Sequence, residues 1–224
     1  MKKFFIISVL ALLGLMTACD NEIPDMPSKH QKIELTEPGS LSDVFTFESD
    51  YRNAEALVIE GEINEWDTGA ILSISATRRL RHVDLSNATI EGNTMSLLYI
   101  PPMVNSLSHN APDADNSMVY HKREADLTRP AEFKYLKLPN TLEELQINGN
   151  YIKITKIILP ASLKKITDMS GTTLNEVHSL AQTPPECSEH TFASGTTLYV
   201  PKGCRQAYAE ATGWNAFNKI KEID

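Results

Sequence analysis

The sequence of 224 residues contains few of the residue types that would define a function at once. It has three cysteines, two tryptophans and 7% aromatic residues, and its 21 Lys and Arg residues are outnumbered by 29 Asp and Glu residues. The net charge of −8 argues against a nucleic-acid partner and against a broad electrostatic attraction to anionic lipid. The length suits one elongated domain or two small ones.

Motifs of the common enzyme classes are also missing. The sequence contains no Gly-x-Ser-x-Gly elbow, phosphate-binding loop, His-Glu-x-x-His or Cys-x-x-Cys. Cys187 with His178 or His190 is conceivable as a nucleophile and its base. Adjacent acids such as Glu143 and Glu144 face opposite sides of a strand, which prevents shared acid–base work. We therefore expect neither enzyme activity nor a cofactor.

The N-terminus has the features of a removable targeting segment. Lys2 and Lys3 precede an apolar run over 4–16, which is shorter than the roughly 20 residues that cross a bilayer and indicates a signal peptide over 1–18. The run ends in a segment that resembles the lipobox of bacterial lipoproteins, Leu15-Met16-Thr17-Ala18-Cys19. That resemblance implies lipidation of Cys19, and several acyl chains on one residue would hold the chain stably at a membrane.

Residues 19–34 are polar, contain two prolines and lack a hydrophobic period. We expect them to form a flexible tether between the lipid and a folded domain over 35–224. Loss of the signal peptide removes two lysines and changes the net charge to −8 − 2 = −10. Cys187 and Cys204 then remain besides the lipidated cysteine, and we expect two half-buried thiols rather than a disulfide.

Internal repetition decides the expected architecture. A spacing typical of leucine-rich repeats occurs twice, in Leu142-x-x-Leu145-x-Ile147-x-x-Asn150-x-Ile152 and in Leu80-x-x-Val83-x-Leu85-x-x-Ala88-x-Ile90. A second series recurs with an offset of 21 residues, as Leu136-x-Leu138-Pro139-x-x-Leu142-x-x-Leu145 and Ile157-x-Leu159-Pro160-x-x-Leu163-x-x-Ile166. Alternating strands of an ordinary all-β domain explain a period of two but not this recurrence. Since one unit cannot bury its own apolar edge, the pattern predicts an α/β, strand-rich leucine-rich repeat solenoid of stacked short parallel strands.

The order of the motifs is similar to that of BspA-like leucine-rich repeat surface lipoproteins of bacteria. At the C-terminus the likeness is carried by Thr183-Pro184-Pro185-x-Cys187, Phe192, Leu198-Tyr199-Val200-Pro201-Lys202-Gly203, Tyr208, Trp214, Phe217 and Ile220. At the N-terminus it is carried by Pro38-Gly39-Ser40-Leu41, Leu57-Val58-Ile59-x-Gly61-x-Ile63-Asn64 and Val83-Asp84-Leu85-Ser86-Asn87-Ala88. The resemblance covers roughly 35–90 and 133–224. It implies a lipid-anchored outer-membrane protein of the cell envelope, surface binding or adhesion, no shared catalytic residues, and a packing role for Cys187.

Residues 196–224 are expected to form a C-terminal cap over the open end of the last repeat. Good helix formers fill 203–211, and Gly213 supplies a stop. The side chains expected to cover the end are Tyr208, Trp214, Phe217 and Ile220. A sugar-binding platform made of Tyr and Trp is the alternative, and the need of stacked repeats for a cover favours the cap.

Residues 91–132 interrupt the repeats and are predicted to form a long, irregular insertion. A faint calcium-loop pattern lies in it, Asp113-x-Asp115-x-Ser117 followed by Glu124. Met118 takes the place of the glycine that such a loop needs for its sharp turn. His109 and His121 could contribute to a zinc site, although their spacing matches no short zinc motif. We therefore expect no metal site.

Alternate residues of the predicted strands should point away from the core and form one continuous face. The candidate binding face comprises His82, Asp84, Glu144, Gln146, Lys156, Ile158, Glu176, His178 and Tyr199. We expect a monomer that binds a protein or a glycan there, with macromolecule binding or adhesion as its function. Two other functions stay open: an accessory glycan-binding lipoprotein of a nutrient-uptake system, and an envelope hydrolase within the 91–132 insertion.

Overall fold

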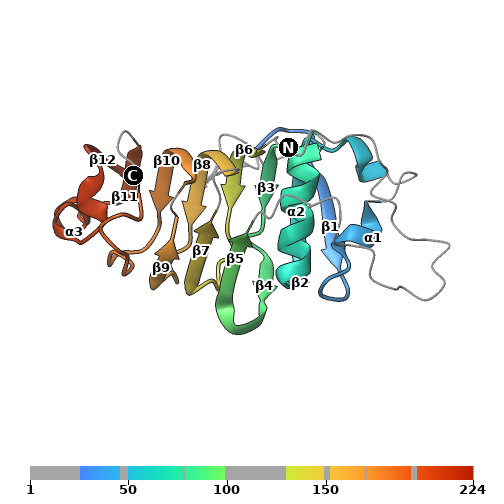
Figure 1. Ribbon diagram of the computed structural model, residues 1–224, viewed down its shortest axis with the longest axis horizontal. Coiled ribbons are helices and arrows are strands. Elements are labelled where there is room, and N and C mark those ends of the chain that lie inside the picture. Colours follow the sequence, from blue (N-terminus) through green and yellow to red (C-terminus); the bar gives the residue numbers. More distant parts are fainter. Residues whose placement is uncertain are drawn as a thin grey trace, which may run out of the picture.

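The computed structural model describes residues 26–45, 50–77, 79–98, 130–148, 152–169, 171–192 and 196–223. Over these ranges the fold is α/β and strand-rich, with parallel strands in two sheets and few helices (Figure 1), as predicted. The elements are β1 Gln31–Leu35, α1 Leu41–Val44, η1 Asp50–Asn53, β2 Ala56–Ile63, α2 Glu65–Thr77, β3 His82–Asp84, β4 Ala88–Ile90, η2 Glu91–Asn93, β5 Thr94–Leu98, β6 Ala131–Lys137, β7 Glu144–Asn148, β8 Ile152–Leu159, β9 Lys165–Asp168, β10 Thr173–Ser179, β11 Thr197–Pro201, α3 Arg205–Glu210, η3 Trp214–Ala216 and β12 Lys219–Ile223.

The larger sheet has nine strands in the order β1-β2-β3-β6-β8-β10-β11-β12, with β4 also paired to β2. All of its pairings are parallel, and one inward row stays in register from β2 to β11. Its members are each at most 1% exposed: Leu57, Val83, Leu136, Ile157, Val177 and Leu198. Leu136 pairs with Ile157, so the 21-residue offset in the sequence corresponds to one step between neighbouring strands.

The smaller sheet consists of β5, β7 and β9. The chain passes from β6 to β7 and from β8 to β9, so successive segments alternate between the two sheets. The inward side chains of the smaller sheet join the same hydrophobic core: Met95, Leu97, Leu145, Ile147 and Ile166. Beyond β5 the helix α2 packs against β5 and β6, and beyond β9 the sheet continues as a single bridge between Lys165 and Glu186.

Proline marks the passage from one sheet to the other. Pro160 directly follows β8, and Pro139 lies two residues after the end of β6, and at both positions the lack of an N–H ends the ladder. The carbonyl of each proline accepts a bond from the backbone N–H three residues later, Leu142 at 3.1 Å and Leu163 at 3.2 Å. The Leu-Pro-x-x-Leu motif is thus a β-turn that feeds the smaller sheet.

Helix α2 is fixed to the preceding chain by a buried carboxylate. Asp67 is fully buried and accepts bonds from the backbone N–H groups of Gly39 (2.6 Å), Leu41 (2.9 Å) and Asn64 (3.0 Å). Asn64 in turn accepts a bond from the Trp66 N–H at 2.9 Å, as an N-cap residue does. One aspartate therefore joins the helix start to the segment that follows β1.

The C-terminal end is covered by an aromatic cluster. Tyr208 and Trp214 are fully buried and Phe217 nearly so, with Tyr208 and Trp214 rings edge to face at 5.0 Å. Gly213 has φ = 78°, and a Cβ there would collide with the Ser188 carbonyl and the Cys187 sulfur. Ile220, expected in the cover, instead lies in β12, the last strand of the larger sheet.

Two expected boundaries are wrong, and so is the expected equivalence of the two leucine-rich spacings. The tether does not extend to residue 34, because β1 begins at Gln31, pairs with β2 and buries Ile33 and Leu35. The insertion does not begin at residue 91, because β5 occupies Thr94–Leu98 and pairs with β7. The two matched leucine-rich spacings are not equivalent units either: Val83 lies in the larger sheet and Leu145 in the smaller one.

Candidate binding surface

The outward side of the larger sheet carries one row of residues that crosses all eight strands of its main path. Starting at β1 and ending at β12, this central outward row consists of Lys32, Val58, Asp84, Lys137, Ile158, His178, Tyr199 and Lys221. Neighbouring strands lie about 4.8 Å apart, so the row is a continuous line of side chains. The parallel register alone produces this line, since the inward row one position away holds the core.

The predicted binding-face residues fall into two groups. Those in the larger sheet are His82, Asp84, Lys156, Ile158, Glu176, His178 and Tyr199. Glu144 and Gln146 lie on β7, in the smaller sheet, so the prediction of one face shared by all nine residues is wrong for these two. The cause is the repeat spacing, which looks the same in the sequence whether the strand joins one sheet or the other.

Two of the predicted residues point outward but are buried. Asp84 is 6% exposed, because its carboxylate accepts a bond from the Ser86 N–H at 2.8 Å and lies 3.8 Å from the Lys137 ammonium. Lys156 is 9% exposed and lies in register between Tyr135, which is fully buried, and Glu176. Asp84 therefore closes the turn after β3, and neither residue offers a free side chain to a partner.

Four residues near the C-terminal end form a connected polar cluster, which we call the His178 cluster: Glu176, His178, Tyr199 and Lys221. The His178 and Tyr199 rings stack with centroids 4.1 Å apart and planes 13° apart. Glu176 lies 3.3 Å from the His178 ring nitrogen and accepts a bond from the Tyr199 hydroxyl at 3.4 Å. The Lys221 ammonium donates to the Tyr199 hydroxyl at 3.3 Å.

Because of these contacts, the side chains of the His178 cluster are fixed before a partner arrives. Holding a side chain in advance reduces the entropy lost on binding, which makes such a cluster suited to recognition. The stacked imidazole lies against one face of the Tyr199 ring, and the Lys221 ammonium lies over the ring at 5.1 Å from its centroid. The cluster therefore offers ring edges and polar groups to a partner rather than an open aromatic face.

Sequence reasoning missed four residues of the central outward row: Lys32, Val58, Lys137 and Lys221. Lys137 could have been found, because it lies between Leu136 and Leu138 in the repeated motif. Lys221 could not, because the strand β12 was expected to be part of the cap. The Tyr–Trp sugar platform is excluded for Trp214, which is fully buried and donates its indole N–H to the Pro185 carbonyl at 2.7 Å.

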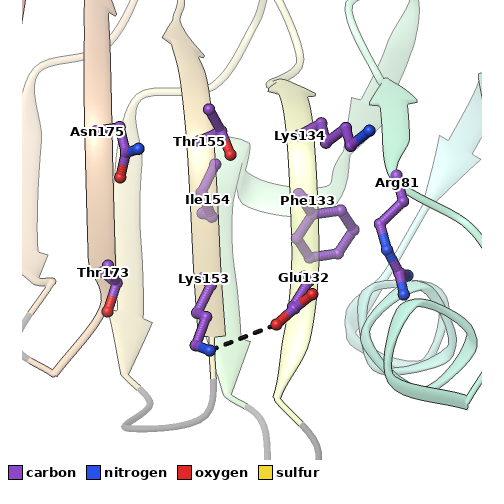
Figure 2. Close-up of a pocket in the computed structure, with 9 residues that line it drawn as sticks. All are labelled: Arg81, Glu132, Phe133, Lys134, Lys153, Ile154, Thr155, Thr173 and Asn175. Atoms are coloured by element: carbon purple, nitrogen blue, oxygen red, sulfur yellow. Dashed lines mark hydrogen bonds and ion pairs between the residues drawn. The ribbon is translucent and has the colours of Figure 1, made fainter.

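A shallow cavity of about 280 Å³ lies over the first halves of β6, β8 and β10 (Figure 2). The described residues that line it are Arg81, Glu132, Phe133, Lys134, Lys153, Ile154, Thr155, Thr173 and Asn175. Figure 2 shows Glu132, Lys153 and Thr173 at one level, with Lys134, Thr155 and Asn175 at the next level along the strands. Sequence reasoning named none of these residues as a site.

The cavity forms where the sheet bends. The Arg81 carbonyl accepts bonds from two successive N–H groups of β6, Lys134 at 2.7 Å and Tyr135 at 3.2 Å. Two residues opposite one is the pattern of a β-bulge, which bends a strand and redirects its side chains. The Glu55 carbonyl repeats the pattern, accepting from Arg81 and His82 at 3.0 Å each.

Of the two cysteines in the described ranges, Cys187 is the candidate nucleophile, and its surroundings do not activate the thiol. Cys187 and Cys204 are free and half-buried. Burial raises the pKa of Cys187, and its thiol donates to the Thr212 carbonyl at 3.3 Å. A thiol with a raised pKa is a poor nucleophile, because the thiolate is the reactive form.

Some of the expected sites cannot be placed. Cys19, His109, Asp113, Asp115, Met118, His121 and Glu124 lie outside the described residues. Among the residues that are described, no three His, Cys, Asp or Glu side chains are grouped to hold a metal ion. No helix in the described ranges is long and apolar enough to span a membrane.

Comparison with known proteins adds no family name. No protein-family model matches this chain, and no curated protein is similar to it.

Proposed function

We propose that this chain is a BspA-like leucine-rich repeat lipoprotein of the bacterial cell envelope that binds a macromolecule on the outward side of its larger sheet. In this proposal the two parallel sheets are the sides of a solenoid, and α3 with its aromatic cluster is the C-terminal cap. Lipid on Cys19 holds the protein at the outer membrane, where it acts as a monomeric binding module rather than an enzyme.

The observation that carries the proposal is the central outward row. A row that keeps register across eight strands gives an extended surface of the kind that stacked repeats present to large partners. Three of the four residues of the His178 cluster lie in this row, and Glu176 lies beside it on β10. The cluster supplies pre-positioned aromatic, cationic and anionic groups, which are common at the centres of binding sites.

The binding test compares the two sheets. Full-length protein in detergent is applied to an array of purified polysaccharides, mucin and matrix glycoproteins. The variant Ile158→Ala/His178→Ala/Tyr199→Ala should lose binding at least tenfold, the equivalent of about 1.4 kcal/mol, without unfolding. The matched control Glu144→Ala/Gln146→Ala, on β7, should bind normally. Equal loss in both variants, or none in the first, contradicts the proposed face.

The anchoring test is separate. Cells grown with labelled palmitate should incorporate label into the native chain and not into Cys19→Ala, because that thiol is the proposed acylation site. Protease added to whole cells should then cut the native chain if it faces outward. Label retained in Cys19→Ala would contradict the lipoprotein assignment.

A further inference from the structure

The cavity over β6, β8 and β10 differs in charge from the chain as a whole. The chain carries a net charge of −8, yet the charged side chains described around the cavity are three cations, Arg81, Lys134 and Lys153, and one anion, Glu132. Glu132 lies 3.4 Å from the Lys153 ammonium and offsets the charge of that lysine, so the inference depends on the exposed Lys134. The local excess of positive charge therefore stands out from an acidic surface.

Lys134 is the cation with most freedom to meet a ligand. Its side chain is exposed, and no described residue forms an ion pair with it. The Arg81 guanidinium, in contrast, donates to the Ser75 and Leu80 carbonyls at 2.8 and 2.7 Å, so it acts as a fixed positive charge. Figure 2 shows the Lys134 side chain extending toward the segment that carries Arg81.

The remaining exposed groups are hydroxyls and an amide at regular intervals. Thr155 and Asn175 lie at the same height along their strands as Lys134, and Thr173 lies at the same height as Lys153. Neighbouring strands are about 4.8 Å apart. These groups both donate and accept hydrogen bonds. A ligand lying across the strands would meet a positive charge at one end and paired donors and acceptors along its length.

We infer that this cavity binds a linear polysaccharide that carries carboxylates, with a carboxylate at Lys134 and sugar hydroxyls at Thr155, Thr173 and Asn175. The inference rests on the proposed binding function and names a ligand class for a second surface. An acidic peptide fits less well, because the apolar residues of the cavity, Phe133 and Ile154, are 2% and 1% exposed and offer no pocket for apolar anchors. Binding of an acidic peptide would then depend on charge alone.

The test measures binding of the full-length chain in detergent to immobilised polygalacturonate at low salt. Lys134→Ala/Lys153→Ala should weaken binding roughly tenfold, as expected for the loss of two exposed charge contacts. The charge-matched control is Lys164→Ala/Lys202→Ala. Lys164 forms a similar exposed ion pair with Glu143 at 2.7 Å, and Lys202 is exposed. The control should bind polygalacturonate as the native chain does.

Two comparison polymers complete the test. Polygalacturonate with its carboxylates reduced to alcohols should bind much more weakly, and poly-glutamate should not compete. Equal loss in the control pair, equal binding of the reduced polymer, or full competition by poly-glutamate overturns the inference.

The outcome is also distinguishable from failure of the proposed function. If the native chain binds an array component through Ile158, His178 and Tyr199 but ignores polygalacturonate, only the cavity inference fails. Polygalacturonate binding that survives Ile158→Ala/His178→Ala/Tyr199→Ala and is lost in Lys134→Ala/Lys153→Ala supports the cavity inference. If that triple variant also retains all array binding, the outward row is contradicted instead.

Discussion

The two sheets enclose one core but continue differently at their ends. The larger sheet runs without a break in its path from β1 to β12, whereas the smaller sheet has a helix, α2, beside its first strand and a single bridge to Glu186 beside its last. A long in-register row can exist only where every segment of the chain contributes a strand. The outward side of the larger sheet therefore offers an extended surface, while the smaller sheet mainly closes the core.

The same comparison explains why the repeat spacing misleads. The Leu-x-x-Leu-x-Ile/Leu pattern places two apolar residues on one side of a strand, and it says nothing about which sheet that strand joins. Val83 pairs with Leu136 in one sheet, and Leu145 pairs with Met95 in the other. The offset of 21 residues does not separate the two classes of strand either, because it pairs Leu136 with Ile157 in the larger sheet and Leu145 with Ile166 in the smaller one.

The largest expected effect compares one core isoleucine from each sheet. Ile157 on β8 lies between paired strands on both sides, with Leu136 and Val177 as its partners, whereas Ile166 on β9 pairs with Leu145 on one side and has only the single bridge to Glu186 on the other. Ile157→Ala should lower the free energy of unfolding by about 4 kcal/mol and Ile166→Ala by about 2–3 kcal/mol, because the segment beside β9 is held by fewer strand pairings and can relax around the cavity. Urea titration followed by circular dichroism measures both. Equal losses would mean that the two sheets are equally enclosed.

A somewhat smaller effect tests the helix that stands beside the smaller sheet. Asp67→Ala leaves three N–H groups without their shared acceptor, a buried one from Leu41 and two part-buried ones from Gly39 and Asn64. We expect a loss of about 3 kcal/mol, since bonds to a charged acceptor are strong and unsatisfied donors are costly. Asp43→Ala, at an exposed position of α1, is the control and should change the melting temperature little. A similar shift for both variants would rule out the proposed role of the carboxylate.

Beyond the C-terminal end of the larger sheet, Tyr208 on α3 makes the stability of the chain depend on pH. Burial raises the pKa of Tyr208 to about 12 from an ordinary value of 10.0. The unfolded chain therefore releases this proton first, so the stabilising contribution is complete below pH 10 and is lost as the pH rises toward 12. The loss is at most about 3 kcal/mol for a shift of this size.

The matched variant for this measurement is Tyr208→Phe. At neutral pH it should cost about 1–2 kcal/mol, because the Ser179 hydroxyl and the Ala181 carbonyl lose their partner. Between pH 10 and 12 its stability should fall less steeply than that of the native chain. Parallel pH profiles of the two proteins would refute the assigned titration.

The smallest expected effect compares two exposed ion pairs, one on each sheet. Lys153 pairs with Glu132 on the larger sheet, and Lys164 pairs with Glu143 beside the smaller one. Lys153→Ala and Lys164→Ala should each change the free energy of unfolding by less than about 0.5 kcal/mol, because solvent screens exposed pairs. Thermal melts at low and high salt measure this. A loss above 1 kcal/mol in either variant would show a structural role that its exposure does not suggest.

Much of the fold could be predicted from residues that repeat. The paired prolines, Pro139 and Pro160, and the offset between Leu136 and Ile157 fix both the turn and the strand register. Strands whose sequence contains only one short alternation of apolar residues were not predicted. β1 offers only Ile33 and Leu35 as its alternation, and β5 only Met95 and Leu97, which is too little to separate a strand from a loop.

The candidate surface was harder to predict than the core. Outward residues such as His178 and Tyr199 follow from alternation along their strands. Alternation does not predict whether an outward residue is buried, as Lys156 shows, because burial depends on what lies over the strand. The cavity at Lys134 could not be predicted either, because it arises from a β-bulge opposite Arg81. A bulge does not change the pattern of apolar residues in the sequence.

The parallel register of the larger sheet has a consequence for how the chain can change in length. Val83 and Leu136 are 53 positions apart in the sequence, yet they pair in the same manner as Leu136 and Ile157, which are 21 apart. The entropy of closing a loop grows only with the logarithm of its length, so the longer connection costs under about 1 kcal/mol more. Extra sequence can therefore accumulate between β5 and β6 while the strands on either side keep their partners.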